Sequence, residues 1–439
     1  MHARLRLDLG GRELLAGGIA LLAPSRCAER ARRVEQRFSS AGDAFAALSA
    51  RSGFDLYLAA LALPPGSEVL VSGLTIPHMV QILEAHGLVV VPFALDPATL
   101  APAPGELERR AGPRTRAVLF AHLFGARADL APSIELAHRR GWLFWEDCAQ
   151  AFGFDGWRGH AGVDLALFSF GLIKTATAVQ GGILCVRDRA VLARMRALHQ
   201  AWSVTPRSDF ARRLARTALL SVLGRPAIFT CFARALESRG RDLDEVLHTF
   251  TRGFPGPDFL ERLRRAPGGP LLWLLDERLA HPERSLWGAR RAWGRELLEA
   301  VAEVEVFGRR ALDHQFWVFA VGTDEPARLV HALRTAGLDA TSRSSLVPVE
   351  PTGGGEPARG ARELLARLVY VPLALDSRPS ERAALADILR GSVRPFVLEP
   401  RAPLRQPGGY TSGPSGPSGQ PPAIHTMSRA IHTTPKATE

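Results

Sequence analysis

Short hydrophobic runs alternate with amphipathic segments along the first 200 residues of the chain. The runs that we predict to be buried strands occupy residues 67–72, 88–93, 117–123, 142–147 and 165–170. Between them, a proline near the start and a glycine at the end predict a helix over residues 77–86, and a further helix is expected over 130–140. This alternation predicts a parallel or mixed α/β sheet. Ligands of such sheets bind where the strands end.

The pattern changes after residue 200. Mixed basic and apolar residues predict a helical insert at about 203–250, and one long helix or two are expected over 271–301. Strands near 316–321 and 368–373, with helices near 327–336 and 380–390, predict a smaller α/β unit. We therefore expect three parts: a large domain over 1–250 that includes the insert, connector helices and a small domain over 251–398, and a Pro/Gly/Ser-rich disordered tail over 399–439.

Composition adds one unusual feature, which is the near absence of lysine. Of the 55 lysine and arginine residues, only Lys174 and Lys436 are lysines. Lys436 lies in the predicted tail, whereas Lys174 lies among apolar and small residues, where a charged side chain is costly to bury. A desolvated lysine loses its proton readily and attacks carbonyl groups, which a guanidinium cannot do. Lys174 is therefore our candidate for a covalent amine nucleophile.

The net charge of +11 raises the question of an anionic partner. Acidic residues are interspersed with the arginines, whereas a nucleic-acid reader usually concentrates its basic residues, so we expect no nucleic-acid binding. The four cysteines lack the spacing of metal ligands, so we predict no metal site and favour reduced thiols in a cytoplasmic protein. No hydrophobic run is long enough to span a membrane, and the apolar stretch at 14–22 lacks the flanks of a signal peptide.

Polar residues stand at the predicted carboxyl edge of the sheet. Asp147 and Gln150 follow the strand at 142–147, a position from which a carboxylate reaches a bound ring. Asp164 lies in a turn, where a structural role is expected. Ser52 and Gly53 precede a helical run and are able to present backbone N–H groups and a hydroxyl to an anion, although an ordinary helix cap has the same pattern.

Four motifs together resemble those of a known family. They are His122-Leu123-Phe124-Gly125, Glu146-Asp147-Cys148-Ala149-Gln150-Ala151, Phe168-Ser169-Phe170 followed by Lys174, and Gly181-Gly182. Their order and separations resemble the fold-type I pyridoxal-phosphate enzymes and, more narrowly, the DegT/StrS type of sugar aminotransferase. The resemblance implies an aspartate aminotransferase-like α/β fold, with a mostly parallel sheet in the large domain and a smaller α/β C-terminal domain.

The same resemblance assigns roles to these residues. Lys174 would hold pyridoxal 5'-phosphate in a Schiff base and then move protons, and Asp147 would pair with the pyridine nitrogen. Gln150 would contact the ring hydroxyl or its neighbourhood. Ser169, together with Ser52 and Gly53, would hold the cofactor phosphate.

Three departures from the family pattern leave questions open. Ile76 stands where many relatives carry an aromatic residue that stacks on the cofactor ring, so either Ile76 or His78 covers it. Phe54 and Asp55 replace a small hydroxyl residue and an alanine. The asparagine-tyrosine motif that reaches a neighbouring active site is missing after residue 198, so a dimer would use other contacts.

The resemblance implies a cytoplasmic, homodimeric aminotransferase that moves an amino group, from glutamate as the expected donor, to a keto group of a nucleotide-linked sugar. One alternative is another reaction of the cofactor adduct, such as elimination, although sugar dehydratases of this family carry histidine in place of the lysine. A second is a cofactor-binding regulatory protein without turnover. For residues 210–235, contact with a membrane surface is an alternative to packing on the subunit or its partner, which we favour.

Overall fold

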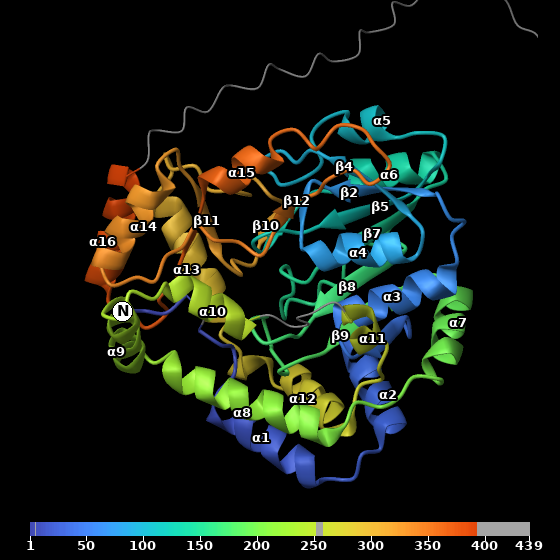
Figure 1. The fold of residues 1–439 in the computed structure, drawn as a ribbon, viewed down its shortest axis with the longest axis horizontal. Coiled ribbons are helices and arrows are strands. Elements are labelled where there is room, and N and C mark those ends of the chain that lie inside the picture. Colours follow the sequence, from blue (N-terminus) through green and yellow to red (C-terminus); the bar gives the residue numbers. More distant parts are fainter. Residues whose placement is uncertain (5, 252–257, 393–439) are drawn as a thin grey trace, which may run out of the picture. The chain divides into compact units, whose positions relative to one another are not determined.

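The computed structural model describes residues 1–4, 6–251 and 258–392, so the tail predicted over 399–439 lies outside the described residues. Its centre is a seven-stranded sheet in the order β1-β9-β8-β7-β5-β2-β4 (Figure 1). These strands are β1 (Ala44–Ala47), β2 (Glu68–Ser72), β4 (Val89–Phe93), β5 (Thr115–Ala121), β7 (Leu143–Asp147), β8 (Leu165–Ser169) and β9 (Gly182–Val186). Strand β9 is antiparallel to both β8 and β1, and the other neighbouring pairs are parallel. The predicted mixed α/β sheet is confirmed.

The helices that cover this sheet pack on two hydrophobic cores, one on each face. They are α1 (Gly11–Leu22), α2 (Cys27–Phe38), α3 (Ala50–Leu61), α4 (Pro77–Ala85), α5 (Glu106–Arg110), α6 (Ala131–Arg139), α7 (Arg189–His199) and α12 (Gly269–Ala280). One core joins α2, α6 and α12 to alternate strand residues such as Phe120 and Phe144. The other joins α3, α4 and α7 to residues such as Leu119 and Trp145, as the two-residue period of a strand requires.

Glycine is required where α3 packs on β9. A Cβ atom at Gly53 would lie 2.0 Å from Leu184 Cδ1, so a larger residue there would push the helix away from the sheet. Gly53 therefore has a packing role apart from the predicted anion contact.

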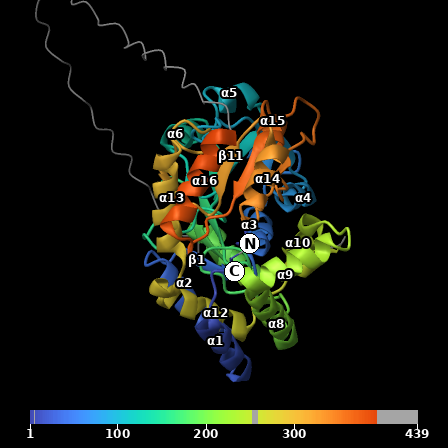
Figure 2. The same ribbon diagram turned by 90° about the vertical axis from the view of Figure 1, so that its left-hand side faces the viewer.

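Helices α8 (Arg207–Leu223), α9 (Pro226–Glu237) and α10 (Leu243–Thr251) form the predicted insert. Helix α8 lies beside α1, and the insert extends to one side of the sheet domain in Figure 2. The predicted boundary at residue 250 falls inside α10, and contacts join the described residues into one compact unit.

The rest of the second half contains the expected small α/β unit. Helix α11 (Phe259–Leu263) packs with α3 in the second core of the sheet domain. The helices that follow α12 are the 3-10 helix η1 (Pro282–Arg284), α13 (Trp287–Ala300), α14 (Pro326–Thr335), α15 (Ala361–Arg367) and α16 (Pro379–Ser392). Strands β11 (Phe319–Gly322) and β13 (Leu368–Val371) pair antiparallel over a third core with α13, α14 and α16. Two short pairs, β3 (Leu74–Thr75) with β12 (Val347–Pro348) and β6 (Ala126–Arg127) with β10 (Asp313–His314), join this unit to the central sheet domain.

Candidate active site

Lys174 lies in the loop that connects β8 to β9, at the end of the sheet where β8 finishes. The loop is closed by the N–H of Phe170, which donates to Gly181 O (2.9 Å), and by that of Lys174, which donates to Gly171 O (3.0 Å). Ala176 and Val179 adopt left-handed conformations, with φ of 54° and 73°. L-residues rarely adopt this conformation without outside support.

That support comes from two distant segments. The N–H of Ala176 donates to Asp8 Oδ2 (2.7 Å), and Asp8 also accepts from the hydroxyl of Ser285 (2.6 Å) and the N–H of Leu286 (2.8 Å). Arg290 of α13 donates from Nη2 to the hydroxyl of Thr175, next to the lysine (2.6 Å). The lysine loop is therefore held by the first residues of the chain and by a helix of its second half.

The small unit adds an aromatic cover. The Lys174 ammonium lies 4.1 Å from the centre of the Trp317 ring, and the ring N–H of Trp317 donates to Ile173 O (2.9 Å). A charged amine over an indole face is a favourable cation–π pair.

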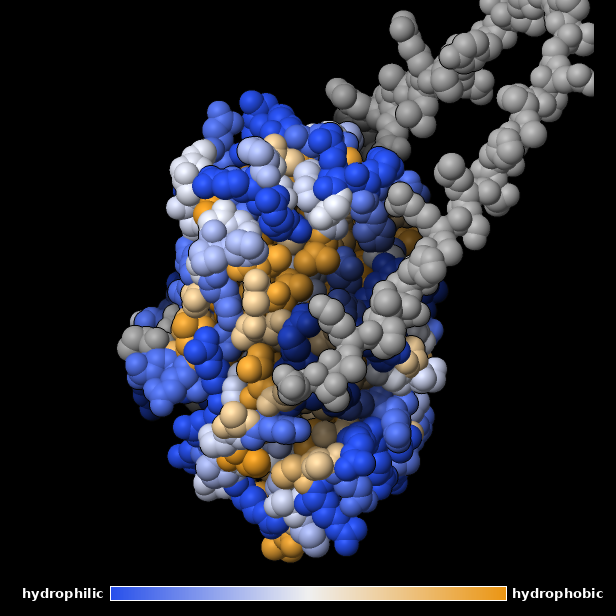
Figure 3. All heavy atoms as spheres, turned by 90° about the vertical axis from the view of Figure 1, so that its right-hand side faces the viewer, coloured by the Kyte–Doolittle hydropathy of each residue, from blue (hydrophilic) through white to orange (hydrophobic). Residues whose placement is uncertain are grey.

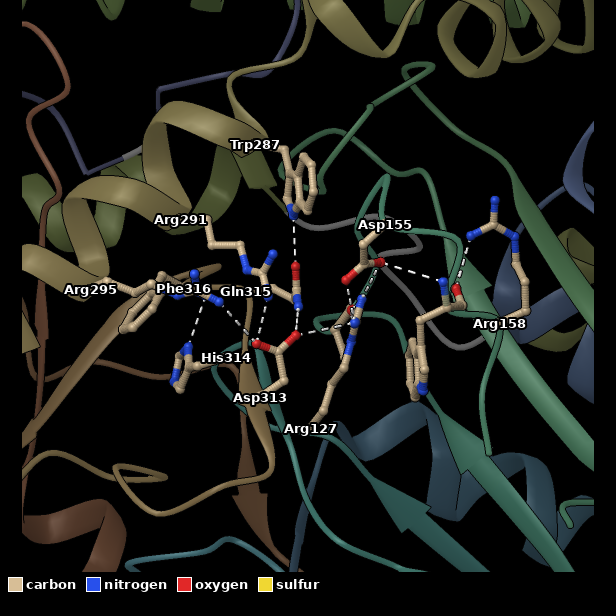
Figure 4. Close-up of polar contacts among 12 residues, drawn as sticks. Arg127, Asp155, Arg158, Trp287, Arg291, Arg295, Asp313, His314, Gln315 and Phe316 are labelled. Atoms are coloured by element: carbon tan, nitrogen blue, oxygen red, sulfur yellow. Dashed lines mark hydrogen bonds and ion pairs between the residues drawn. The ribbon is translucent and has the colours of Figure 1, made fainter. Parts of the chain in front are cut away.

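A polar network positions the segment that carries Trp317 (Figure 4). Asp313 accepts from Arg291 Nη2 (2.7 Å) and Arg127 Nη1 (3.3 Å). The N–H of Gln315 donates to Gly125 O (2.7 Å). These contacts attach the segment to both α13 and the β6 region, only two residues before Trp317.

The surroundings of Lys174 adjust its acidity. Burial lowers the pKa of Lys174 to about 8, against the opposing effect of the nearby Asp147 carboxylate and with a further lowering by Arg51. Burial also raises the pKa of Asp147, although the N–H of Ala149 donates to its Oδ1 (2.9 Å) and Lys174 favours the charged form. Lys174 and Asp147 are thus brought together, as expected from the sequence.

Three of the predicted cofactor contacts have polar atoms that are not engaged within the described chain. Asp147 uses only Oδ1, and Gln150 accepts from the N–H of Phe124 through Oε1 (2.7 Å). Among the described residues, Asp147 Oδ2, the Gln150 amino group and the Ser169 hydroxyl have no hydrogen-bond partner. An acceptor and two donors are therefore available around Lys174.

Ser52 and Gly53 are placed differently, in the first turn of α3. The N–H of Ser52 and that of Gly53 donate to Oγ and O of Ser49, at 3.1 and 3.0 Å. The Ser52 hydroxyl lies 2.9 Å from the Ser49 hydroxyl. Because these groups already cap the helix, their contact with a phosphate stays a prediction.

Arg51, which the sequence reasoning missed, lies beside these two residues. Its Nη1 lies 2.7 Å from His78 Nδ1, and its charge acts on both Lys174 and Asp147. Burial, then Arg51, lowers the pKa of His78 to about 4, and the His78 ring stacks on Phe259 at 4.8 Å. Nothing in the sequence distinguishes Arg51 from the many other arginines, because its neighbours come from α4 and the central strands.

A buried acid lies on the opposite face of β7. Burial opposes the ionisation of Glu146, but His122 and His160 hold its pKa at about 2. His122 Nε2 lies 3.5 Å from Glu146 Oε1, and one His160 ring nitrogen pairs with the same oxygen. The Cys148 thiol also approaches this carboxylate (3.8 Å), although the cysteine spacing had indicated no ligand cluster. The group sits directly behind Asp147, whose charge His122 favours.

Comparison with known proteins finds a family match over part of the chain. Residues 28–214 match the model of the DegT/DnrJ/EryC1/StrS aminotransferase family. A GDP-perosamine synthase from Caulobacter vibrioides is 33% identical over 157 residues, which are 35% of this chain and 42% of that protein. The chain thus matches less than half the length of this relative.

Solved structures extend the likeness in fold to most of the chain. The aminotransferase TlmJ from Streptoalloteichus hindustanus superposes with a TM-score of 0.65 at 20% identity, over 89% of this chain and 98% of that one. The E. coli GDP-4-keto-6-deoxy-D-mannose-3-dehydratase, solved with bound hydrated PLP, has the same TM-score at 16% identity, over 89% and 99% of the two chains. The expected fold is confirmed, and residues 28–214 resemble the DegT/DnrJ/EryC1/StrS aminotransferase family, whose model they match.

Proposed function

We propose that this protein is a pyridoxal-phosphate-dependent aminotransferase that moves an amino group from an amino acid, with glutamate as the expected donor, to a keto group of a nucleotide-linked sugar. The single observation that carries the proposal is the Lys174 amine, whose pKa is lowered to about 8 beside Asp147. The family match and the nucleotide-sugar enzymes among its relatives support the substrate class.

The residues around Lys174 fit this cofactor. Lys174 supplies the amine that attaches it, and Asp147 Oδ2 is available to accept from a protonated ring nitrogen. The Gln150 amino group is available to donate to a ring oxygen, and the Ser169 hydroxyl to a phosphate. When bound, the cofactor supplies the electron sink that makes the carbon next to the amine acidic.

The chain itself contributes proton transfer and exclusion of water. With a pKa near 8, the Lys174 amine is well suited to take up and return a proton near neutral pH. Trp317 covers this amine on one side, and the Asp8 and Arg290 tethers hold its loop at a fixed position. The dehydratase alternative is disfavoured because sugar dehydratases of the family that this chain resembles carry histidine in place of the lysine, whereas this chain has Lys174.

We further propose a cytoplasmic homodimer. Figure 3 shows hydrophobic residues gathered in a band on one face of the molecule, between hydrophilic margins. A second copy of the chain would remove such a surface from water. The oligomeric state is tested by light scattering coupled to size-exclusion chromatography.

The function is tested by the absorbance spectrum of the protein loaded with pyridoxal phosphate, before and after addition of glutamate. We expect a yellow protein that glutamate bleaches, and a borohydride-reduced adduct on the peptide that contains Lys174. Lys174→Ala removes both signals, whereas Lys436→Ala, which changes the only other lysine, retains them. A wild-type protein that takes up no cofactor would rule out the proposal.

A further inference from the structure

Helices α8 and α9 expose an unusual combination of side chains. Among the described residues, nine large hydrophobic side chains are exposed, and six of them lie on α1, α8 and α9. They are Leu15, Ile19 and Leu22 on α1, Leu219 and Val222 on α8, and Ile228 on α9. The concentration of these residues on neighbouring helices makes this a surface that needs an explanation.

The exposed residues follow the helical period. On α8, Phe210, Leu214 and Thr217 are buried, while Leu219 and Val222 continue the opposite, solvent-facing side. On α1, the spacing of Leu15, Ile19 and Leu22 is that of a single helical stripe. Helices α1 and α8 therefore each pack one side on the protein core and have a second, apolar stripe that faces solvent.

Basic charge is concentrated in the same segment. Residues 207–241 contain eight arginines and only two acidic residues, Asp209 and Glu237, so this short segment carries six of the eleven net positive charges of the chain. Arg225 and Arg234 flank the exposed residue Ile228 and form no side-chain hydrogen bond or ion pair within the described chain. Two exposed arginines thus lie close in sequence to the apolar residues where α8 meets α9, which we call the corner.

The corner itself is built from two helices bent sharply against each other. No single described helix is long and apolar enough to cross a membrane, but α8 and α9 meet that criterion together, with a bend of 91° between them. Such a bend, with one side packed on the protein, suits a helix pair that lies in a lipid interface and does not span it.

We propose that the surface formed by the exposed residues of α1, α8 and α9 docks the protein on an anionic lipid bilayer. Leu219, Val222 and Ile228 enter the region between head groups and acyl chains, and the surrounding arginines contact the lipid phosphates. This inference goes beyond the proposed reaction and does not depend on it.

The charge of the surface favours lipid over a second copy of the chain. A two-fold contact places the same patch on both subunits, so the arginines of 207–241 would face one another. Like charges brought together in this way cost free energy, whereas an anionic bilayer offers the opposite charge over the whole surface.

Docking would also place the membrane near the lysine loop. Leu220, Leu223 and Phe229, on the inner side of the corner, line an apolar pocket together with Leu172 and Ile173. The corner and the segment that ends in Lys174 thus line the same pocket.

The experiment is flotation of the full-length protein with vesicles of phosphatidylcholine alone or with one third phosphatidylglycerol. We expect binding to the anionic vesicles only. Replacing Leu219, Val222 and Ile228 by serine, or Arg225 and Arg234 by glutamate, is expected to weaken partitioning at least about tenfold, since each arginine near such a surface contributes about fivefold. Lys174→Ala retains binding, so failure of docking and failure of the proposed reaction are distinguishable.

The controls use exposed residues elsewhere in the described chain. Serine at Leu198, Val204 and Leu312, the other three exposed large hydrophobic residues, leaves binding unchanged, as does glutamate at Arg139 and Arg328, which are 66% and 68% exposed. The proposal is overturned if anionic vesicles do not bind, or if the test variants bind as well as the controls. It is also overturned if the serine variant of α8 and α9 converts an oligomer to a monomer while the wild type ignores vesicles.

Discussion

The lysine loop and the α8–α9 corner both combine apolar residues with positive charge, but they satisfy that charge in opposite ways. Around Lys174 the charges are enclosed and opposed by Asp147, and the loop is fixed by Asp8 and Arg290. At the corner, Arg225 and Arg234 are exposed and have no ion-pair partner in the described chain. The first arrangement suits a small ligand with few, fixed polar groups, and the second suits an extended anionic surface.

The largest effect is expected where the charge near Lys174 is removed. Asp147→Asn is expected to lower kcat/KM about 1,000-fold, roughly 4 kcal/mol, because a neutral amide cannot stabilise a protonated ring nitrogen. Steady-state kinetics with glutamate and a keto-sugar nucleotide measure this change. Asp164→Asn is the control and retains most activity, because within the described residues this carboxylate accepts only from the N–H of Phe144 (2.8 Å). Equal losses in both variants would contradict the role of Asp147, and vesicle binding is unchanged in either case.

A smaller effect, on stability, is expected when the contact between Asp8 and the lysine loop is removed. Asp8→Ala leaves Arg278, which lies 3.3 Å from Asp8 Oδ1, buried without this carboxylate, and removes the bond to Ala176. We expect the free energy of unfolding to fall by about 3 kcal/mol, as measured by urea denaturation. Asp376→Ala, at an exposed ion pair with Arg6, is expected to change it by less than about 1 kcal/mol. A small change in Asp8→Ala would mean that the loop is held without the tether.

Trp317 covers Lys174 and is not part of the α8–α9 corner, so its replacement should affect the lysine loop alone. Trp317→Leu is expected to lower kcat/KM by a factor corresponding to about 1–2 kcal/mol, through loss of the cation–π pair and the bond to Ile173. Trp317→Phe keeps an aromatic face and is expected to lose less. If the two variants are equal, the ring face does not contribute.

The smallest effect is a shift in pH dependence. Because the pKa of Lys174 is about 8, about one amine in ten is neutral at pH 7, compared with about one in 3,000 at the usual value of 10.5. Only the neutral amine attacks an aldehyde, so attachment of pyridoxal phosphate to the apoprotein should accelerate with rising pH and level off above about pH 8.

The contribution of Arg51 is tested in the same assay. Arg51 lowers the pKa of Lys174, so Arg51→Gln should raise this pKa and move the profile to higher pH. Arg32→Gln, on the exposed side of α2, is the control. A profile that does not move would show that Arg51 does not contribute to the acidity of the lysine.

The sequence predicted the parts of the site that belong to single strands and their ends. Lys174 was proposed because lysine is rare in this chain, and Asp147 and Gln150 because they end or follow strand β7, whereas Ser169 was proposed only from the family resemblance. The hydrophobic runs located the parallel strands, but β1 was missed. Strand β1 (residues 44–47) is short and lies between two helices. Its pairing with β9 joins segments far apart in the chain, so no local sequence pattern predicts it.

The remaining parts of the site depend on contacts between distant segments. Asp8, Arg51 and Trp317 act on the lysine from three separate regions, and none has a local signature that distinguishes it from a surface residue. For α8, the sequence left contact with a membrane surface as an alternative to packing, without showing which residues are exposed. A helix with apolar residues on both sides looks buried in the sequence, and only the packing reveals which side is left in water.

The tethers of the lysine loop also have a consequence for protein synthesis. Asp8 is among the first residues to leave the ribosome and Trp317 comes much later, yet both contact the same loop. Until residue 317 has been translated, Lys174, the only lysine in the first 435 residues, has no indole cover. Nascent chains that stop short of this residue should therefore expose Lys174 to aldehydes and other electrophiles, and only longer chains should protect it.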